Sequence, residues 1–103
     1  MRLRTIVYVS TAVRPFSSSD LFALLAQSGE RNQQVGITGM LLHKSGCFLQ
    51  ALEGDEVEVR KVYQRIERDT RHRNIVVLLN EPIEHREFTE FVEPALATRS
   101  QEP

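Results

Sequence analysis

The spacing of apolar residues in the first part of the chain predicts a strand followed by a helix. Residues 5–10 (TIVYVS) are β-branched and aromatic, which favours a strand, and residues 14–20 (RPFSSSD) supply a proline and several helix-capping residues. The apolar stripe of the following helix has helical spacing at Leu21, Leu24 and Leu25. This helix is expected to end near Gly29, and if its path continues, Asn32 returns to the core-facing side.

The central part of the chain predicts a β-hairpin. Residues 36–43 (GITGMLLH) and 46–54 (GCFLQALEG) are two apolar runs joined by a short turn with Gly46 near the bend. Side chains alternate along a strand, so Cys47, Leu49 and Ala51 are expected on one face and Phe48, Gln50 and Leu52 on the other. Both faces are therefore apolar except at Gln50, whose amide must find hydrogen-bond partners.

A second helix and one or two strands complete the predicted fold. Asp55 and Glu58 resemble a capping box. The helical stripe that follows is formed by Val59, Val62, Tyr63 and Ile66. Residues 74–82 (NIVVLLNEP) form an apolar run typical of a strand that is covered on both faces, and a short edge strand is expected before Pro94.

The order of elements, β-α-β-β-α-β with an additional short strand, predicts an α+β, ferredoxin-like fold. Right-handed crossovers would place both helices on one face of a mixed sheet. The opposite face carries apolar residues such as Val7 and Val9, and no third helix is predicted to cover it. We therefore expect a homo-oligomer formed through this uncovered sheet face. Residues 1–93 are expected to form the domain, and residues 94–103 a polar tail.

Composition narrows the class of protein but identifies no chemistry. The chain has 103 residues, enough for one domain, with 41% hydrophobic residues, 26% charged residues and a formal net charge of -1. This balance gives no reason to expect nucleic-acid binding, and no apolar run is long enough to span a membrane. The single cysteine, Cys47, is expected to be a reduced, buried thiol. These features predict a cytoplasmic protein that is neither exported nor anchored.

Five residues form the candidate site. The predicted topology could bring together a phenol, two amides, a guanidinium and a carboxylate, from Tyr8, Asn32, Gln50, Arg65 and Asp69. Such a group of donors and acceptors in an apolar surround suits a planar heterocycle. Taken singly, the residues allow plainer interpretations: Gln50 as a satisfied core residue, and the Arg65 and Asp69 side chains as a surface ion pair four residues apart. Both interpretations remain open on composition and spacing alone.

Other candidate chemistry is weaker. The three histidines lack the spacing of metal ligands, and one cysteine adds no zinc pattern. The basic run around Arg71, His72 and Arg73 is typical of a solvated helix end, although it could also contact a phosphate.

Four segments together resemble the BLUF family, the sensors of blue light using FAD. They are YVS at 8–10, DLFALLAQSGERNQQVGITGMLLHKSGCFLQALEG at 20–54, VYQRIERDTRH at 62–72 and EPIEHREF at 81–88. The resemblance runs in register over about residues 4–88. It implies a ferredoxin-like sheet with a flavin, FAD or else FMN, between the two helices.

The resemblance also implies a role for each candidate residue. Tyr8 and Gln50 would lie beside the isoalloxazine ring, and Asn32 would bind its polar edge. From the second helix and its end, the residues implied to approach the flavin are Arg65, Asp69, Arg71 and His72. Blue light would drive electron and proton transfer from Tyr8, and recombination would leave the Gln50 side chain rearranged and the absorption shifted to the red. Such a domain is a non-enzymatic photoreceptor module.

The sequence departs from the family near its end. Phe91 and Glu93 stand where the family commonly has a tryptophan and a methionine, and the usual C-terminal helices or effector domain do not follow. We therefore expect the output to run through a separate effector protein or a changed oligomer. Two alternatives remain open: a flavin-binding domain that has lost signalling, and a small acylphosphatase-like hydrolase, which would need an arginine in a phosphate loop directly after the first strand, where VSTAVRPFSSS offers only Arg14.

Overall fold

The computed structural model of the chain describes residues 2–14, 17, 19–20, 29–89 and 91–92. Its strands and complete helix, in chain order, are β1 (Leu3–Ala12), β2 (Thr38–Lys44), β3 (Cys47–Asp55), α2 (Glu56–Arg68), β4 (His72–Ile83) and β5 (Phe91–Val92). Residues 29–34, before β2, are also helical.

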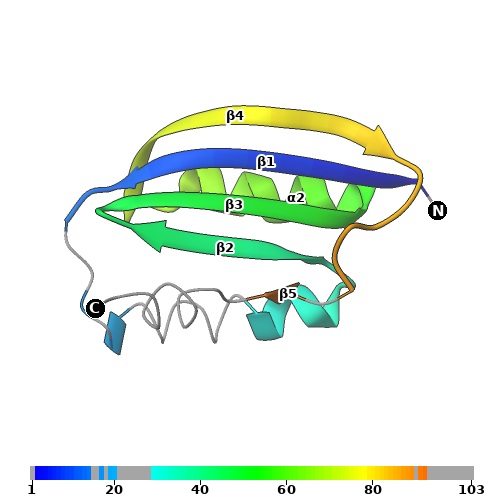
Figure 1. Ribbon diagram of the computed structural model, residues 1–103, viewed down its shortest axis with the longest axis horizontal. Coiled ribbons are helices and arrows are strands. Elements are labelled where there is room, and N and C mark those ends of the chain that lie inside the picture. Colours follow the sequence, from blue (N-terminus) through cyan, green and yellow to red (C-terminus); the bar gives the residue numbers. More distant parts are fainter. Residues whose placement is uncertain (1, 15–16, 18, 21–28, 90, 93–103) are drawn as a thin grey trace.

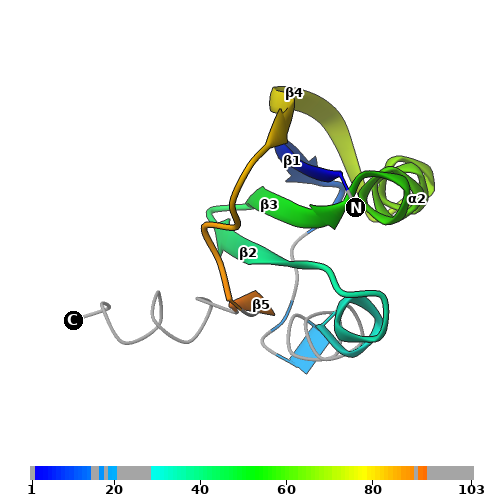
Figure 2. The same ribbon diagram turned by 90° about the vertical axis from the view of Figure 1, so that its right-hand side faces the viewer.

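The strands form one sheet in the order β4-β1-β3-β2-β5 (Figure 1). Neighbouring strands are antiparallel except β2 and β5, which are parallel, so the sheet is mixed. Helix α2 and the helical residues 29–34 lie on the same face of the sheet (Figure 2). The predicted ferredoxin-like α+β fold is therefore confirmed.

The register of the central strands decides which side chains share a face. Tyr8 of β1 lies opposite Gln50 of β3, and Gln50 lies opposite Leu41 of β2. Because side chains alternate along a strand, these three residues point to one face of the sheet. This is the face that α2 covers, since Ile6 and Leu52, two residues along, pack in the core with Val59 of the helix.

The β2–β3 hairpin forms as predicted, with a two-residue turn at Ser45 and Gly46. Both residues have positive φ angles, 53° and 78°, the combination that a type I′ hairpin turn requires. Gly39 is required for a different reason. A Cβ atom there would lie 1.9 Å from the carbonyl oxygen of Ala51 in the neighbouring strand. Only glycine lets β2 approach β3 this closely.

Helix α2 begins where the sequence predicts it. The side chain of Asp55 accepts hydrogen bonds from the backbone amides of Val57 (3.1 Å) and Glu58 (3.4 Å), which caps the helix. The predicted stripe faces the sheet. The hydrophobic core consists of Ile6, Ile37, Leu52, Val59 and Val62, with Val35, Tyr63 and Ile66 packed against it.

Two expectations about burial are wrong. Strand β4 is not covered on both faces: it is an edge strand, and its residues from Val76 to Leu79 are exposed. Cys47 is also exposed rather than buried, because it follows the hairpin turn directly as the first residue of β3. An apolar run in the sequence cannot by itself distinguish a central strand from an edge strand, or the middle of a strand from its end.

Several predictions concern residues outside the described part of the chain. These are the helical stripe at 21–25, the polar tail at 94–103 and the position of Glu93. The short strand expected before Pro94 is present as β5.

Candidate functional site

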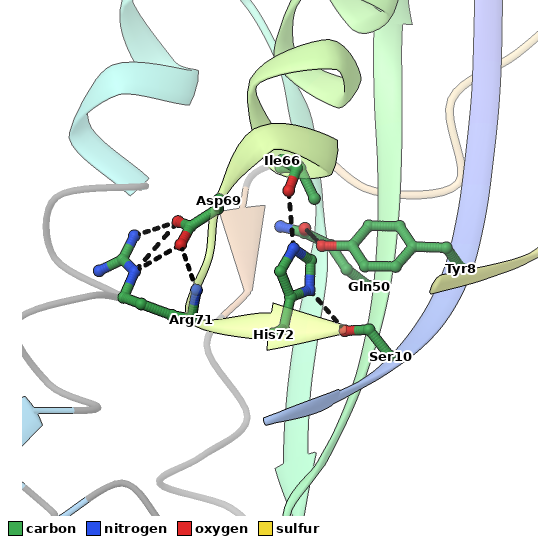
Figure 3. Close-up of polar contacts among 7 residues, drawn as sticks. All are labelled: Tyr8, Ser10, Gln50, Ile66, Asp69, Arg71 and His72. Carbon is green, nitrogen blue, oxygen red and sulfur yellow. Dashed lines mark hydrogen bonds and ion pairs between the residues drawn. The ribbon is translucent and has the colours of Figure 1, made fainter. Parts of the chain in front are cut away.

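The site is centred on a hydrogen bond between the two middle strands of the sheet. The Tyr8 hydroxyl donates to Oε1 of Gln50 (Figure 3). Tyr8 is 3% exposed and Gln50 is 4% exposed, so both polar side chains lie inside the domain. The bond forms because β1 and β3 place the two residues directly opposite each other on the face covered by α2.

The environment of Tyr8 keeps its phenol protonated. Burial raises the pKa of Tyr8 well above its ordinary value of 10.0, and the charges of Tyr63 and Asp69 raise it further. Tyr63, from α2, packs edge-on against the Tyr8 ring with a centroid distance of 5.8 Å. At neutral pH, Tyr8 is therefore a neutral hydrogen-bond donor.

His72 ties the start of β4 to the end of α2 beside this pair. Its Nε2 lies 2.6 Å from the carbonyl oxygen of Ile66, and its Nδ1 lies 2.8 Å from Oγ of Ser10. A carbonyl can only accept, so Nε2 carries a proton; in the neutral ring, Nδ1 then accepts from the Ser10 hydroxyl. The imidazole ring also lies edge-on to the Tyr8 ring, with centroids 6.3 Å apart.

Asp69 and Arg71 form a charged pair at the end of α2 (Figure 3). The Arg71 backbone amide and its Nε each lie 2.9 Å from Oδ1 of Asp69, and a guanidinium nitrogen also pairs with Oδ2. This hydrogen bonding holds the pKa of Asp69 below its ordinary value of 3.8, although desolvation opposes it. Arg65 is exposed on α2, and among the described residues the ion-pair partner of Asp69 is Arg71 and not Arg65.

Asn32 is buried as the helical spacing predicts, with 4% of its surface exposed. Its backbone carbonyl accepts hydrogen bonds from the amides of Val35 (3.2 Å) and Ile37 (2.8 Å), which ends the helical segment and directs the chain into β2. The structure places Asn32 on the same side of the sheet as Tyr8 and Gln50. No hydrogen bond within the described chain joins it to them.

Four residues that contact or support the site were missed from the sequence. Ser10 could have been found, because it lies two residues after Tyr8 on the same strand and so shares its face. Tyr63 was assigned to the core stripe only, and Ile66 contributes a backbone carbonyl, for which side-chain chemistry gives no signal.

The fourth is Glu53, a buried carboxylate (2% exposed) on the face of the sheet opposite the helices. It accepts hydrogen bonds from the backbone amides of Glu87 (2.9 Å) and Phe88 (2.9 Å). These amides belong to the connection from β4 to β5, which crosses that face of the sheet (Figure 2). Glu53 therefore fastens the approach to β5 onto the strand that carries Gln50.

A ferredoxin-like sheet with a buried tyrosine–glutamine pair beneath its helices defines a class of small ligand-binding sensor domains. The family model described as "Sensors of blue-light using FAD" matches residues 3–92. The chain belongs to the BLUF family. It is a blue-light flavin sensor domain whose cofactor is FAD.

Relatives with curated names agree with this assignment. The chain is 41% identical over 86 residues to the photoactivated adenylate cyclase subunit beta of Euglena gracilis, and 37% identical over 103 residues to the alpha subunit from the same organism. These matches cover 84% and 94% of this chain and 10% of each relative. The chain thus spans about a tenth of the length of the curated relatives it matches.

Solved structures show the same fold. BlrB, a BLUF protein in its dark state, has a TM-score of 0.81 and 29% identity, covering 95% of this chain and 80% of that chain. A bacterial light-regulated adenylyl cyclase has a TM-score of 0.82 and 33% identity, covering 88% of this chain and 28% of that chain. The family assignment favours a sensor module over the small hydrolase.

A search of the described residues for membrane-spanning helices found none with the length and hydropathy required.

Proposed function

We propose that Tyr8 and Gln50 are the light-responsive pair of this sensor domain, and that light reverses the hydrogen-bond polarity that the Gln50 carboxamide presents, by rotation or tautomerisation. The single observation that carries the proposal is the buried hydrogen bond from the Tyr8 hydroxyl to Oε1 of Gln50. A carboxamide has an acceptor and a donor on nearly isosteric ends. It can therefore reverse its hydrogen-bond polarity with little change in packing.

The polar groups around this pair fit a flavin. Within the described chain, no residue accepts a hydrogen bond from the amide nitrogen of Gln50, although the side chain is buried. This nitrogen is not among the fully buried side-chain atoms that lack a partner, so it can reach a group beyond the described chain, and a ring nitrogen or carbonyl of a bound heterocycle would accept its N–H. The residues we assign to flavin binding are Tyr8, Asn32, Gln50, Arg65, Asp69, Arg71 and His72. When bound, FAD supplies a chromophore for blue light that accepts an electron when excited.

Tyr8 is the donor of one electron and one proton in this proposal. Its raised pKa keeps the O–H proton in place before illumination. Loss of an electron makes a phenol strongly acidic, so the proton moves along the existing hydrogen bond to Oε1 of Gln50. When electron and proton have returned to Tyr8, the Gln50 carboxamide, by rotation or tautomerisation, presents the opposite hydrogen-bond polarity. The low dielectric of the interior makes the two hydrogen-bond patterns differ in energy.

The experiment that tests this proposal is the substitution Gln50→Leu. We expect the variant to bind flavin and to lose the light-induced red shift of its absorption, because leucine presents neither donor nor acceptor. Gln64→Leu is the matched control, since Gln64 is exposed on α2 and should keep the full shift. An undiminished shift in Gln50→Leu would refute the role of Gln50.

A flavin-binding domain without signalling is the second candidate, because Phe91 begins β5 where the family commonly has a tryptophan. The native protein distinguishes the two candidates directly. A yellow protein whose spectrum does not change reversibly under blue light would support the second candidate, and a reversible red shift would exclude it.

We propose that the domain itself has no enzymatic activity and acts on a separate effector protein. Two kinds of observation support this. The polar groups gathered at the site serve hydrogen bonding to a heterocycle, and the matched relatives named as adenylate cyclases extend far beyond the segment they share with this chain. Residues 1–93 would form the sensing unit, with 94–103 as a tail.

We further propose that a second copy of the chain covers the sheet face opposite the helices. Val7, Val9 and Leu49 of this face are only partly buried in the described structure. Val9→Lys should then weaken self-association in sedimentation experiments, and a stable monomer of the native protein would contradict the proposal.

We assign the domain to the cytoplasm, because a single exposed cysteine suits a reducing compartment. We propose no membrane or nucleic-acid partner, because a formal net charge of -1 gives no reason to expect attraction to a polyanion.

A further inference from the structure

Strand β4 is a long sheet edge with no described neighbour on its outer side. It is 12 residues long and pairs with β1 on its other side (Figure 1). Four consecutive residues in its middle, Val76 to Leu79, are between 40% and 59% exposed. Proteins usually protect an edge with lysines, prolines, bulges or a short strand; β4 carries Pro82 near its end and two register shifts against β1, near Leu78 and near Asn74, but no lysine and no covering segment among the described residues.

The sequence of this edge is complementary to itself when reversed. Residues 73–81 read RNIVVLLNE, so Val77 is the centre of a segment with two aliphatic residues, then an asparagine, then a charged residue on each side. The two charges are opposite, Arg73 at one end and Glu81 at the other. Both charged residues are exposed, and neither has an ion pair with a described residue.

We propose that β4 pairs antiparallel with β4 of a second copy of this chain, about a two-fold axis at Val77. In that register Val77 faces Val77, Val76 faces Leu78 and Ile75 faces Leu79. Arg73 of each copy then lies opposite Glu81 of the other, so the axis generates two ion pairs. The result is one continuous sheet shared by the two domains.

We infer that the strand beside β4 comes from a second copy of this chain. A two-fold interface must be complementary to itself, and residues 73–81 are complementary to their own reverse. Aliphatic cross-strand pairs and opposite charges are the combinations that stabilise neighbouring antiparallel strands. The formal net charge of -1 per chain leaves little repulsion between copies. The pairing of β4 with β1 shifts register near Leu78, next to the axis, so both copies would carry that irregularity symmetrically.

This inference concerns a different surface from the sheet face and does not rest on the light response. An edge pairing leaves Val7 and Val9 where they are. Flavin absorption and the light-induced shift therefore report whether each variant is folded, while self-association is measured separately.

A charge-swap series on the flavin-loaded protein in the dark tests the register. With Arg73→Glu, each end of the interface has one pair of glutamates facing each other, position 73 of one copy and Glu81 of the other. We expect the dimer dissociation constant to rise by roughly tenfold or more. Adding Glu81→Arg to the same chain restores opposite charges and should return the dissociation constant to near the native value. Lys44→Glu is the control, because it makes the same charge change at an exposed position at the end of β2.

Disulfide trapping tests the axis directly. In a Cys47→Ser background, which removes the exposed native thiol, Val77→Cys should form a dimer-linking disulfide on mild oxidation because residue 77 faces itself. Val76→Cys is the matched control, since residue 76 faces residue 78 and its thiols lie too far apart. The linked peptide is identified by mass spectrometry.

The results that would overturn the proposal are distinct. A native protein that remains monomeric in sedimentation up to its solubility limit excludes the dimer. A dissociation constant that Arg73→Glu leaves unchanged in a Val9→Lys background, which removes the sheet-face contact, or crosslinking that is as efficient through residue 76 as through residue 77, excludes this edge and register. Loss of dimer in Val9→Lys alone would instead indicate the sheet face.

Discussion

Tyr8 and Gln50 are polar and almost fully buried, whereas Val76 and Leu78 are apolar and more than half exposed. Both placements are unfavourable for the isolated chain. Burying polar groups costs free energy unless each is hydrogen-bonded, and half-exposed aliphatic side chains forgo roughly half of the about 1.5–3 kcal/mol that full burial of each would contribute. The first region recovers part of its cost through the Tyr8–Gln50 hydrogen bond.

The chemistry that would compensate each region is different. At the centre of the sheet, an amide nitrogen lacks an acceptor among the described residues, which calls for a polar heterocycle. At the edge, backbone groups and aliphatic side chains lack a neighbour, which calls for another strand. The two unfavourable regions therefore indicate two kinds of partner, a small molecule inside and a protein outside.

The largest expected effect is on the buried region. Tyr8→Phe removes the hydroxyl that donates to Gln50 and should abolish the light-induced red shift while the bound flavin remains. Tyr63→Phe is the control, because Tyr63 packs on the Tyr8 ring without a hydrogen bond to Gln50 and should keep the shift. Difference spectra before and after blue light provide the measurement. A normal photocycle in Tyr8→Phe would show that the buried pair has a structural role only.

The second largest effect is expected on the free energy of unfolding when a leucine of the core, rather than one of the sheet edge, is replaced by alanine. Leu52 is fully buried, and Leu52→Ala should lower the free energy of unfolding by about 2–5 kcal/mol, the range for core leucines. Leu78→Ala, at 59% exposure, should change it by less than about 0.5 kcal/mol in the monomer. Urea denaturation at a concentration that keeps the protein monomeric measures both. Equal losses would mean that the edge is covered within the chain.

Local sequence patterns predicted most of the fold because the relevant forces are local. The capping side chain of Asp55 acts on amides two and three residues away, and the Gly46 turn is set by its own φ angle. Alternation along β3 likewise placed Gln50 correctly on the face opposite Ala51.

What the sequence could not predict depends on contacts between distant segments. One of the two interpretations left open paired Asp69 with Arg65 on helical spacing, but the helix ends at Arg68 and the chain turns, so Arg71 comes into reach. Glu53 gave no signal, because its partners are backbone amides more than thirty residues later. Strand β4 was predicted from its aliphatic content, but its place at the edge depends on the order of strands.

A third prediction concerns Glu53, a buried polar residue outside the light-responsive pair. Glu53→Gln replaces a charged acceptor of two backbone hydrogen bonds by a neutral amide, and we expect a loss of about 1–3 kcal/mol in unfolding free energy. Glu58→Gln, which removes a surface ion pair with Lys61 and one acidic charge from the first turn of α2, should cost less than about 1 kcal/mol. Comparable small losses would show that the β4–β5 connection is held by other contacts.

The smallest effect is expected at Asp69, where the site meets solvent. Its pKa lies below the ordinary 3.8 because Arg71 hydrogen-bonds the carboxylate, so its stabilisation is present at neutral pH and is lost as the pH falls through the folded-state pKa. Arg71 is half exposed, and solvent screening limits the expected contribution to about 0.2–1 kcal/mol.

Asp69→Asn should therefore lower the unfolding free energy slightly at pH 7 and have no effect at a pH where Asp69 is protonated in both states. Urea denaturation at a series of pH values from 7 downward measures the difference, which should shrink as the pH falls through the folded-state pKa of Asp69. Because the charge of Asp69 also raises the pKa of Tyr8, the same substitution should lower the pKa of that phenol while leaving it protonated at neutral pH. A stability loss that persists at the acidic pH would mean that Asp69 acts through packing and not through its charge.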